Sequence, residues 1–163
     1  MTDFTPIRHK LVGISPKAYE HPTDRAMTAA LDAIPMLDRV IRSLAEMRVE
    51  RAYRQFLLAN SVRIGPNQLP ALWASYQHVL ETLDMPAEYE LYLMQTPVAN
   101  AFTFGTKEPI VVLHSGLLDI LDEPELQAVM AHEVAHILSG HSLYRTVLIL
   151  LILLGQATQL PGF

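Results

Sequence analysis

The sequence predicts an α+β fold, in which a helical N-terminal layer packs against a small β-sheet and one further helix lies on that sheet. Composition is the first observation behind this prediction: the chain has 163 residues, of which 50% are hydrophobic and 18% are charged, enough for one domain with a core. The second observation is a change in the pattern of apolar residues along the chain. Apolar residues recur at helical spacing before Pro86, and short β-branched runs bounded by turn residues follow it.

The chain divides into an arm and one domain. Residues 1–22 contain three prolines and no hydrophobic period, which indicates an extended N-terminal arm. We expect residues 23–163 to form the domain. Its parts are a helical region (23–84), the sheet with its last helix (88–141), and an apolar C-terminal segment (142–163).

Three stretches of the helical region have the helical period. Apolar residues are spaced for a helix over residues 23–34, and Pro35 then interrupts it. Residues 36–60 read as one or two amphipathic helices. After a Gly-Pro-Asn turn, residues 68–83 form a further helix with one apolar stripe.

Three short strands and one capped helix follow. The strands are predicted at residues 90–95, 99–104 and 110–113, and residues 117–121 form a helical turn. The next helix has a strong start signal, because Asp122 can cap it, a proline follows in the first turn, and Glu125 stands at the capping-box position. This helix runs from Glu123 through Leu138, and its continuation to Leu154 is left open.

Composition excludes several classes of function. The formal net charge is −5 and no run of Lys or Arg occurs, so nucleic acid is not an expected partner. Cysteine is absent, so any metal ion must be held by His, Asp or Glu. No signal-peptide stretch opens the chain, which predicts a cytoplasmic location. The aliphatic octet at residues 147–154 adds the expectation of membrane association or self-association.

The chemistry lies in a His-Glu-x-x-His pattern inside the capped helix. Four residues turn a helix by about 400°, so His132 and His136 lie one above the other and can share one Zn²⁺ ion. Glu133 is rotated by about 100° from His132, which places its carboxylate beside the metal as a general base for water. The alternative is that the two rings are ordinary polar groups. The apolar flanks argue against it, because a buried His-Glu-His ridge without a metal is costly to desolvate.

Three blocks, in this order, carry a family resemblance: Val98-Ala99-Asn100-Ala101-Phe102, then Ile110 to Leu118, then Glu125 to Glu133 with the following Gly140-His141. They resemble the HtpX-type zinc metallopeptidases, the family that also contains the CAAX prenyl proteases. The resemblance covers about residues 90–145.

The resemblance implies a zinc-dependent endopeptidase with His132 and His136 as metal ligands and Glu133 as the general base. It also implies that the first two blocks line the active site. An exposed strand edge there can pair with an extended substrate. The candidates for this edge are Asn100, Ala101, Phe102, Val111 and Val112. The alternative is that the second strand is buried core.

The third metal ligand is missing from the expected place. In the family it is a Glu on a later helix, but residues 142–163 contain no Asp, Glu, His or Cys. On a continuous helix, His141 would lie about 13 Å beyond His132 and on the opposite side, so we expect a structural role for it. The alternatives left open are four upstream side chains: Glu108, His114, Asp119 and Glu123. The chain is therefore expected to be a truncated protease that binds zinc weakly and is weakly active or inactive alone.

The predicted function is hydrolysis of peptide bonds in a protein or peptide substrate, with Zn²⁺ as the cofactor. The alternative is a non-catalytic module that binds a peptide or a membrane partner on the same scaffold. The two are discriminated by Glu133→Gln in the full-length parent, which abolishes turnover in an enzyme while metal is retained, and leaves a binding module unchanged.

Overall fold

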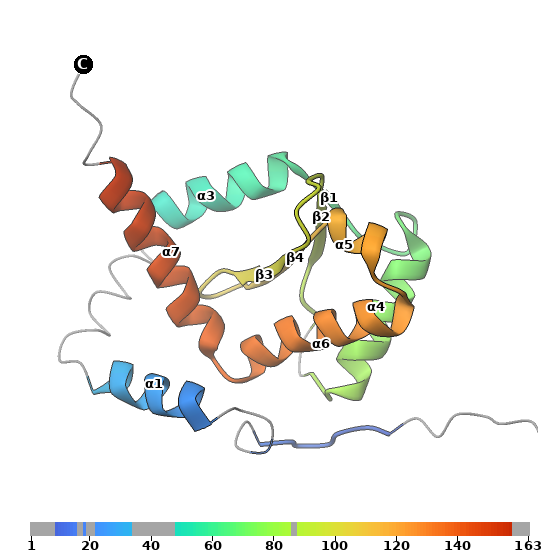
Figure 1. Cartoon of the computed structure of the whole chain (residues 1–163), viewed down its shortest axis with the longest axis horizontal. Coiled ribbons are helices and arrows are strands. Elements are labelled where there is room, and N and C mark those ends of the chain that lie inside the picture. The colour runs from blue at the N-terminus through green and yellow to red at the C-terminus, as the bar shows by residue number, and fades with distance from the viewer. Residues whose placement is uncertain (1–8, 16–17, 19–21, 34–47, 86–87, 158–163) are drawn as a thin grey trace, which may run out of the picture.

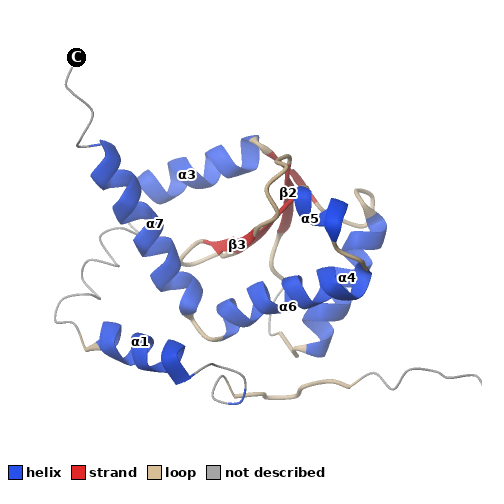
Figure 2. Cartoon of the chain, in the orientation of Figure 1, coloured by secondary structure: helices blue, strands red, loops and turns tan. Residues whose placement is uncertain are grey.

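A computed structural model of the chain describes residues 9–15, 18, 22–33, 48–85 and 88–157. The fold is α+β, as predicted, with a mixed four-stranded sheet among helices (Figures 1 and 2). The element order is α1 (Pro22–Asp32), α3 (Arg48–Ala59), β1 (Ser61–Arg63), α4 (Pro70–Thr82), β2 (Leu91–Met94), β3 (Ala101–Phe104), β4 (Ile110–His114), α5 (Gly116–Ile120), α6 (Glu123–Leu138) and α7 (His141–Ala157).

The sheet has the strand order β1-β2-β4-β3. β2 pairs with β4 in parallel, and the outer strands β1 and β3 pair antiparallel with their neighbours. The three predicted strands correspond to β2, β3 and β4. The sequence analysis missed β1, because three residues on a sheet edge are too short to show a period of two.

Each face of the sheet carries its own apolar core. Val111 and Leu113 of β4 belong to a cluster with residues of α4 and α6, including Tyr76 and Met130. The alternate residues of β4 belong to a second cluster, whose other members include residues of α3 and α7. Helices therefore cover both faces, which explains why β4 is a continuous apolar run (Figure 1).

The predicted helices of the N-terminal half are confirmed where the structure describes them. α1 matches the helix expected at residues 23–34, and α3 matches the second part of residues 36–60. Residues 34–47 lie outside the described part of the chain, as does most of the predicted arm. α4 begins at Pro70, two residues later than expected, because Leu69 has a left-handed backbone with φ 54° and cannot be helical.

α6 has the predicted start. The Asp122 side chain accepts a hydrogen bond from the Glu125 backbone N–H, and the Glu125 carboxylate accepts one from the Asp122 N–H, each at 2.9 Å. These bonds satisfy two backbone donors that a helix start leaves unpaired. The capping box therefore fixes where the helix begins, and so which residues occupy each of its faces.

α6 does not continue into the aliphatic octet. It ends at Leu138, and Gly140 follows with φ 74°, a left-handed conformation typical of the residue after a helix. α7 then starts at His141 in a new direction (Figure 1). Val147 is buried in the second core cluster, whereas Leu148 and Ile152 are more than half exposed. In the described residues, no helix is both long and apolar enough to cross a membrane.

Candidate metal centre

The rings of His132 and His136 converge on α6. Their Nε2 atoms are 3.1 Å apart and their ring centroids are 4.5 Å apart. This convergence follows from the spacing, since residues four apart lie one above the other on a helix. His132 is exposed and His136 is partly buried, so the paired nitrogens lie at the border of solvent.

The pair fits a zinc ion. Two nitrogens that each lie about 2.0–2.1 Å from one tetrahedral zinc ion are about 3.3–3.4 Å apart, close to the observed separation. A ligand must also be neutral, because zinc competes with the proton for the ring nitrogen. Burial, followed by the charge of the neighbouring His132, lowers the pKa of His136 and favours its neutral form.

Glu133, which lies between them in sequence, is turned toward the sheet. Its residue is 5% exposed. Its Oε2 atom lies 3.2 Å from the hydroxyl of Thr103 on β3 and 3.5 Å from Nη1 of Arg145 on α7. The Thr103 hydroxyl also lies 3.1 Å from the backbone oxygen of Glu133. The carboxylate is therefore held from two other elements, a contact set that no spacing within α6 could predict.

His141 lies beside His136, although it belongs to the next helix. The turn at Gly140 brings its ring centroid to 5.7 Å from that of His136, with the rings tilted by 48°. The premise of a continuous helix, from which the position of His141 was expected, is therefore wrong, because α6 ends at Leu138 and α7 begins at His141. The signal that could have revealed this is the Ser139-Gly140 pair at the end of the apolar period.

A complete donor set for a metal is not found in the described residues. Within them, no group of three or more His, Asp or Glu side chains is placed to hold an ion. Two of the upstream candidates have other contacts. His114 lies 3.2 Å, through Nδ1, from the Val98 carbonyl, and Glu123 accepts a hydrogen bond from Ser75 at 2.7 Å. α6 therefore contributes two converging imidazoles.

The structure separates the five residues predicted to form a substrate edge. β4 is paired on both sides, and Val111 and Val112 are fully buried, so neither can accept another strand. For these two valines the structure favours the alternative of buried core. β3 is an outer strand, so Asn100, Ala101 and Phe102 remain as candidates.

Register defines which backbone groups β3 directs away from β4. The His114 N–H donates to the Asn100 carbonyl, and residues that are hydrogen-bonded to the partner strand alternate along an antiparallel ladder. Ala101 and Thr103 therefore direct their backbone N–H and C=O groups away from β4. Thr103 is fully buried, and the next outward group, the Gly105 N–H, donates to Thr146 on α7. At the beginning of β3, Asn100 is exposed, whereas Ala101 is 7% exposed.

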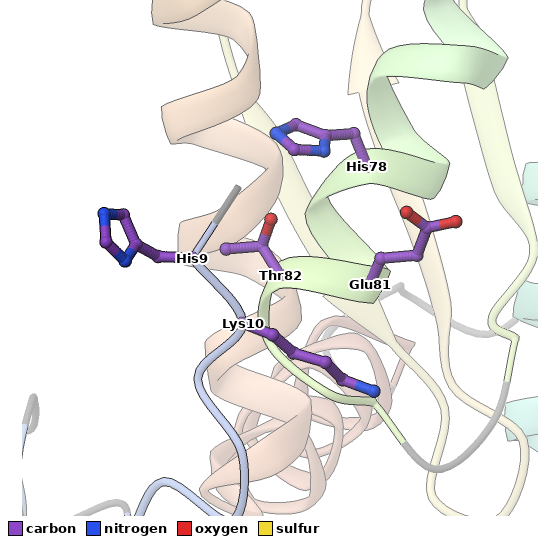
Figure 3. A pocket seen from close by; sticks show the side chains of 5 residues that line it. All are labelled: His9, Lys10, His78, Glu81 and Thr82. Atoms are coloured by element: carbon purple, nitrogen blue, oxygen red, sulfur yellow. The ribbon is translucent and has the colours of Figure 1, made fainter. Parts of the chain in front are cut away.

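A cavity lies where His9 and Lys10 meet α4. It is lined by His9, Lys10, His78, Glu81 and Thr82. The two imidazoles come from separate segments and do not point toward one another (Figure 3). The Lys10 ammonium instead pairs with Asp84 at 2.6 Å. This cavity offers no convergent ligands comparable to the pair on α6.

Comparison with known proteins places the chain in a family. The profile of peptidase family M48 matches residues 66–161, more than half of the chain and a region that includes α4 and α6. The chain therefore belongs to peptidase family M48, and the predicted resemblance to HtpX-type metallopeptidases is confirmed.

Individual relatives agree. The plastoglobule-localized metallopeptidase 48, chloroplastic, of Arabidopsis thaliana is 34% identical over 89% of this chain and 42% of its own length. A protease HtpX homolog of Tropheryma whipplei is 39% identical over 50% of this chain and 28% of its own length. One from Dictyoglomus thermophilum is 48% identical over 29% of the chain and 16% of its own length. The chain thus spans less than half the length of each of these relatives. No solved structure matches it.

Proposed function

We propose that this chain carries the metal-binding helix of a zinc-dependent endopeptidase. The observation that supports this most directly is the 3.1 Å separation of the His132 and His136 Nε2 atoms on α6. Membership of peptidase family M48 supports the class of reaction. In this proposal both histidines bind Zn²⁺ through Nε2, and a protein or peptide is the substrate.

The proposed chemistry divides between the ion and Glu133. A bound Zn²⁺ polarises a peptide carbonyl and lowers the pKa of a water molecule. Glu133 accepts a proton from that water and passes it to the leaving amine, the usual task of a general base that becomes a general acid. Its burial, together with the contacts to Thr103 and Arg145, limits the number of orientations its carboxylate can take.

The beginning of β3 is the proposed place for substrate. An extended peptide that pairs with Ala101 would add a strand to the open end of this edge. Thr103 and Phe104, further along β3, are fully buried, so the paired stretch is short. Such pairing recognises backbone more than side chains, which favours a broad range of sequences.

The alternative function is a binding module without catalysis. Its specific support is that the described residues supply two converging ligands and no complete set of three. In that case β3 still binds an extended peptide, but Glu133 serves only to tie α6 to the sheet.

Zinc titration by calorimetry tests the metal site. We expect weak binding by this chain, because two protein ligands are fewer than the three of a catalytic zinc site. His136→Ala should abolish it. His78→Ala on α4 is the matched control, since it removes an imidazole that lies outside the converging pair, and it should leave binding unchanged. Equal binding by His136→Ala and the unmodified chain would contradict the proposed site.

Glu133→Gln separates the two functions. The amide retains the size of the carboxylate but cannot accept the proton from water. If the chain is an enzyme, hydrolysis of an unstructured protein such as casein is lost while zinc affinity is retained. If the chain is a binding module, its affinity for extended peptides is unchanged and no zinc-dependent hydrolysis is measured with either form.

We further propose that α7 mediates self-association or membrane contact. Leu148 and Ile152 lie one turn apart on α7, and they are 58% and 51% exposed. Full burial of an exposed aliphatic side chain contributes about 1.5–3 kcal/mol, and about half of that remains to be gained by side chains that are half exposed. Sedimentation of the chain and of the Leu148→Ser/Ile152→Ser double variant tests this. A monomer at all concentrations, together with no binding to lipid vesicles, would refute it.

A further inference from the structure

Thr103 connects the strand that would hold substrate to the base that would act on it. Thr103 is fully buried on β3. Its hydroxyl lies 3.2 Å from the Glu133 carboxylate oxygen Oε2 and 3.1 Å from the Glu133 backbone oxygen, across thirty positions in sequence. A hydroxyl has one proton, and the charged carboxylate is the stronger of the two acceptors.

The second donor reaches the same oxygen. Nη1 of Arg145 is 3.5 Å from Oε2, and both donors are therefore on one side of the carboxylate. An oxygen that two donors engage is a poorer proton acceptor than its partner on the same carboxyl group. The remaining oxygen, Oε1, is then the better proton acceptor of the two.

β3 also relates the base to the substrate. Ala101 and Thr103 are two residues apart on the strand, so their side chains lie on one face, the face that α6 covers. The backbone of Ala101 is the proposed substrate edge, and the side chain of Thr103 is the contact to Glu133. The distance between substrate and base is thus set by one rigid strand.

We propose that Thr103 is a positioning residue for the reaction: its hydroxyl holds Oε2 of Glu133 and so presents Oε1 to the attacking water. This inference rests on the proposed function of Glu133 as a base. Thr103 does not touch substrate or metal in this proposal, and it acts only through the carboxylate. Misplacement of such a group by about 1 Å can lower a rate by about 100-fold.

Three variants of the full chain separate positioning from packing. Thr103→Val keeps the volume and strand preference of threonine but removes the hydroxyl. Thr103→Ser keeps the hydroxyl and removes the methyl group. Thr103→Ala, which lacks both, serves as a second hydroxyl-free variant should the valine variant not fold. We expect the hydroxyl-free variants to lose about 10- to 100-fold in kcat at unchanged KM, and the serine variant to retain most of it.

Thr146→Val is the matched control. Thr146 is also a fully buried threonine, and its hydroxyl accepts a hydrogen bond from Gly105 at the end of β3. Thr146→Val likewise removes a buried hydroxyl, at a similar cost in stability, but the hydroxyl that it removes binds Gly105 and not Glu133. We expect a lower unfolding midpoint for this variant with kcat reduced less than threefold.

A measurement without metal makes the inference independent of activity. The ¹³C resonance of the Glu133 carboxylate, assigned by its loss in Glu133→Gln, reports how the group is held. In the metal-free chain we expect it to move toward the position of a solvent-exposed glutamate in Thr103→Val and to stay in place in Thr103→Ser and Thr146→Val.

The outcomes are distinct. An unchanged resonance in Thr103→Val shows that the hydroxyl does not hold the carboxylate, and overturns the proposal. So does an equal loss of kcat in the valine, serine and Thr146→Val variants, which indicates packing alone. If His136→Ala binds zinc as well as the unmodified chain, the proposed function fails, and the resonance still decides whether Thr103 positions Glu133.

Discussion

Arg145 on α7 reaches Glu133 on α6, with its Nη1 atom 3.5 Å from Oε2 of the carboxylate. The two residues meet because the chain turns at Gly140, which sends α7 back past the sheet and α6. The Glu133 side chain is 6% exposed and that of Arg145 is 38% exposed. The more exposed guanidinium therefore partly offsets the desolvation cost of burying the Glu133 carboxylate.

The first prediction concerns this ion pair. Arg145→Met keeps the aliphatic stem and removes the charge, so Glu133 loses this cation and retains the neutral donor Thr103. Because the pair is half-exposed and long, we expect a coupling free energy of about 0.2–1 kcal/mol between the two side chains. A double-mutant cycle of Arg145→Met and Glu133→Gln, measured by urea unfolding, gives this value, and 1 M NaCl should reduce it.

Arg63 provides the matched control. It pairs with Glu90 at 3.2 Å but is 67% exposed, and Arg54 also pairs with Glu90 at 3.3 Å. The loss of Arg63 therefore leaves Glu90 with a cation, and the cycle of Arg63→Met with Glu90→Gln should give a smaller coupling. A coupling at Glu133 no larger than this would mean that Arg145 does not stabilise the carboxylate.

The second prediction concerns Gly140, which has φ 74° and open space around its Cα. An alanine meets no neighbouring atom there, but its Cβ disfavours the left-handed backbone by about 1–2 kcal/mol. Alanine also reduces the conformational entropy of the unfolded chain, which offsets about 0.4–1 kcal/mol of this cost. We expect Gly140→Ala to lower the free energy of unfolding by about 1 kcal/mol.

Gly65→Ala is the control for that experiment. Gly65 also has open space around its Cα, but its φ is not positive, so the added Cβ carries no conformational cost. We expect it to be neutral or slightly stabilising in urea unfolding. Gly140→Asn should fall between the two, because asparagine tolerates the left-handed region. If Gly140→Ala is as stable as Gly65→Ala, the turn does not depend on glycine.

Interactions between residues that are close in sequence account for the features that could be predicted from the sequence. The capping box of Asp122 and Glu125 involves residues three apart, and the convergence of the His132 and His136 rings involves residues four apart. Both follow from helix geometry alone. The apolar run of β4 is similarly local, because burial on both faces removes the need for polar residues.

The rest depends on contacts between distant residues. Thr103 and Glu133 are thirty positions apart, and their hydrogen bond exists only because β3 lies against α6. The same holds for Val111 and Val112, whose strand is central because both β2 and β3 pair with it. No periodicity within a segment reports on the order of strands in a sheet. His141 is an intermediate case, since the glycine before it was a local signal for the turn.

The third prediction concerns Gly116 at the start of α5. A Cβ on Gly116 would lie 2.4 Å from the Pro97 carbonyl oxygen and 2.7 Å from its carbon, which are backbone atoms. The Gly116 N–H also donates to Thr96 in the same loop at 2.9 Å. Gly116→Ala must therefore displace the loop that precedes β3, and we expect a loss of about 2–3 kcal/mol in urea unfolding.

The Gly65→Ala variant again serves as the reference for that measurement. Because the displaced loop leads into Asn100, Gly116→Ala should also weaken binding of an extended peptide, whereas Gly140→Ala should affect it less. A Gly116→Ala chain with the stability of the Gly65→Ala chain would show that the loop yields at little cost.

The fourth prediction is a pH dependence at the N-terminal segment. A hydrogen bond from Lys10, at 2.6 Å, lowers the pKa of Asp84 below its ordinary value of 3.8. Since the folded-state pKa is the lower one, the carboxylate stabilises the fold above the unfolded pKa, and this contribution is lost as pH falls through the folded value. Asp84→Asn keeps a residue that tolerates the φ of 51° at this position. We expect it to unfold at lower urea concentration than the unmodified chain at pH 7, with the difference shrinking from about pH 5 to pH 2. Lys10→Met should reproduce this pattern without adding to it, and a difference that stays constant with pH would rule out the ion pair as its source.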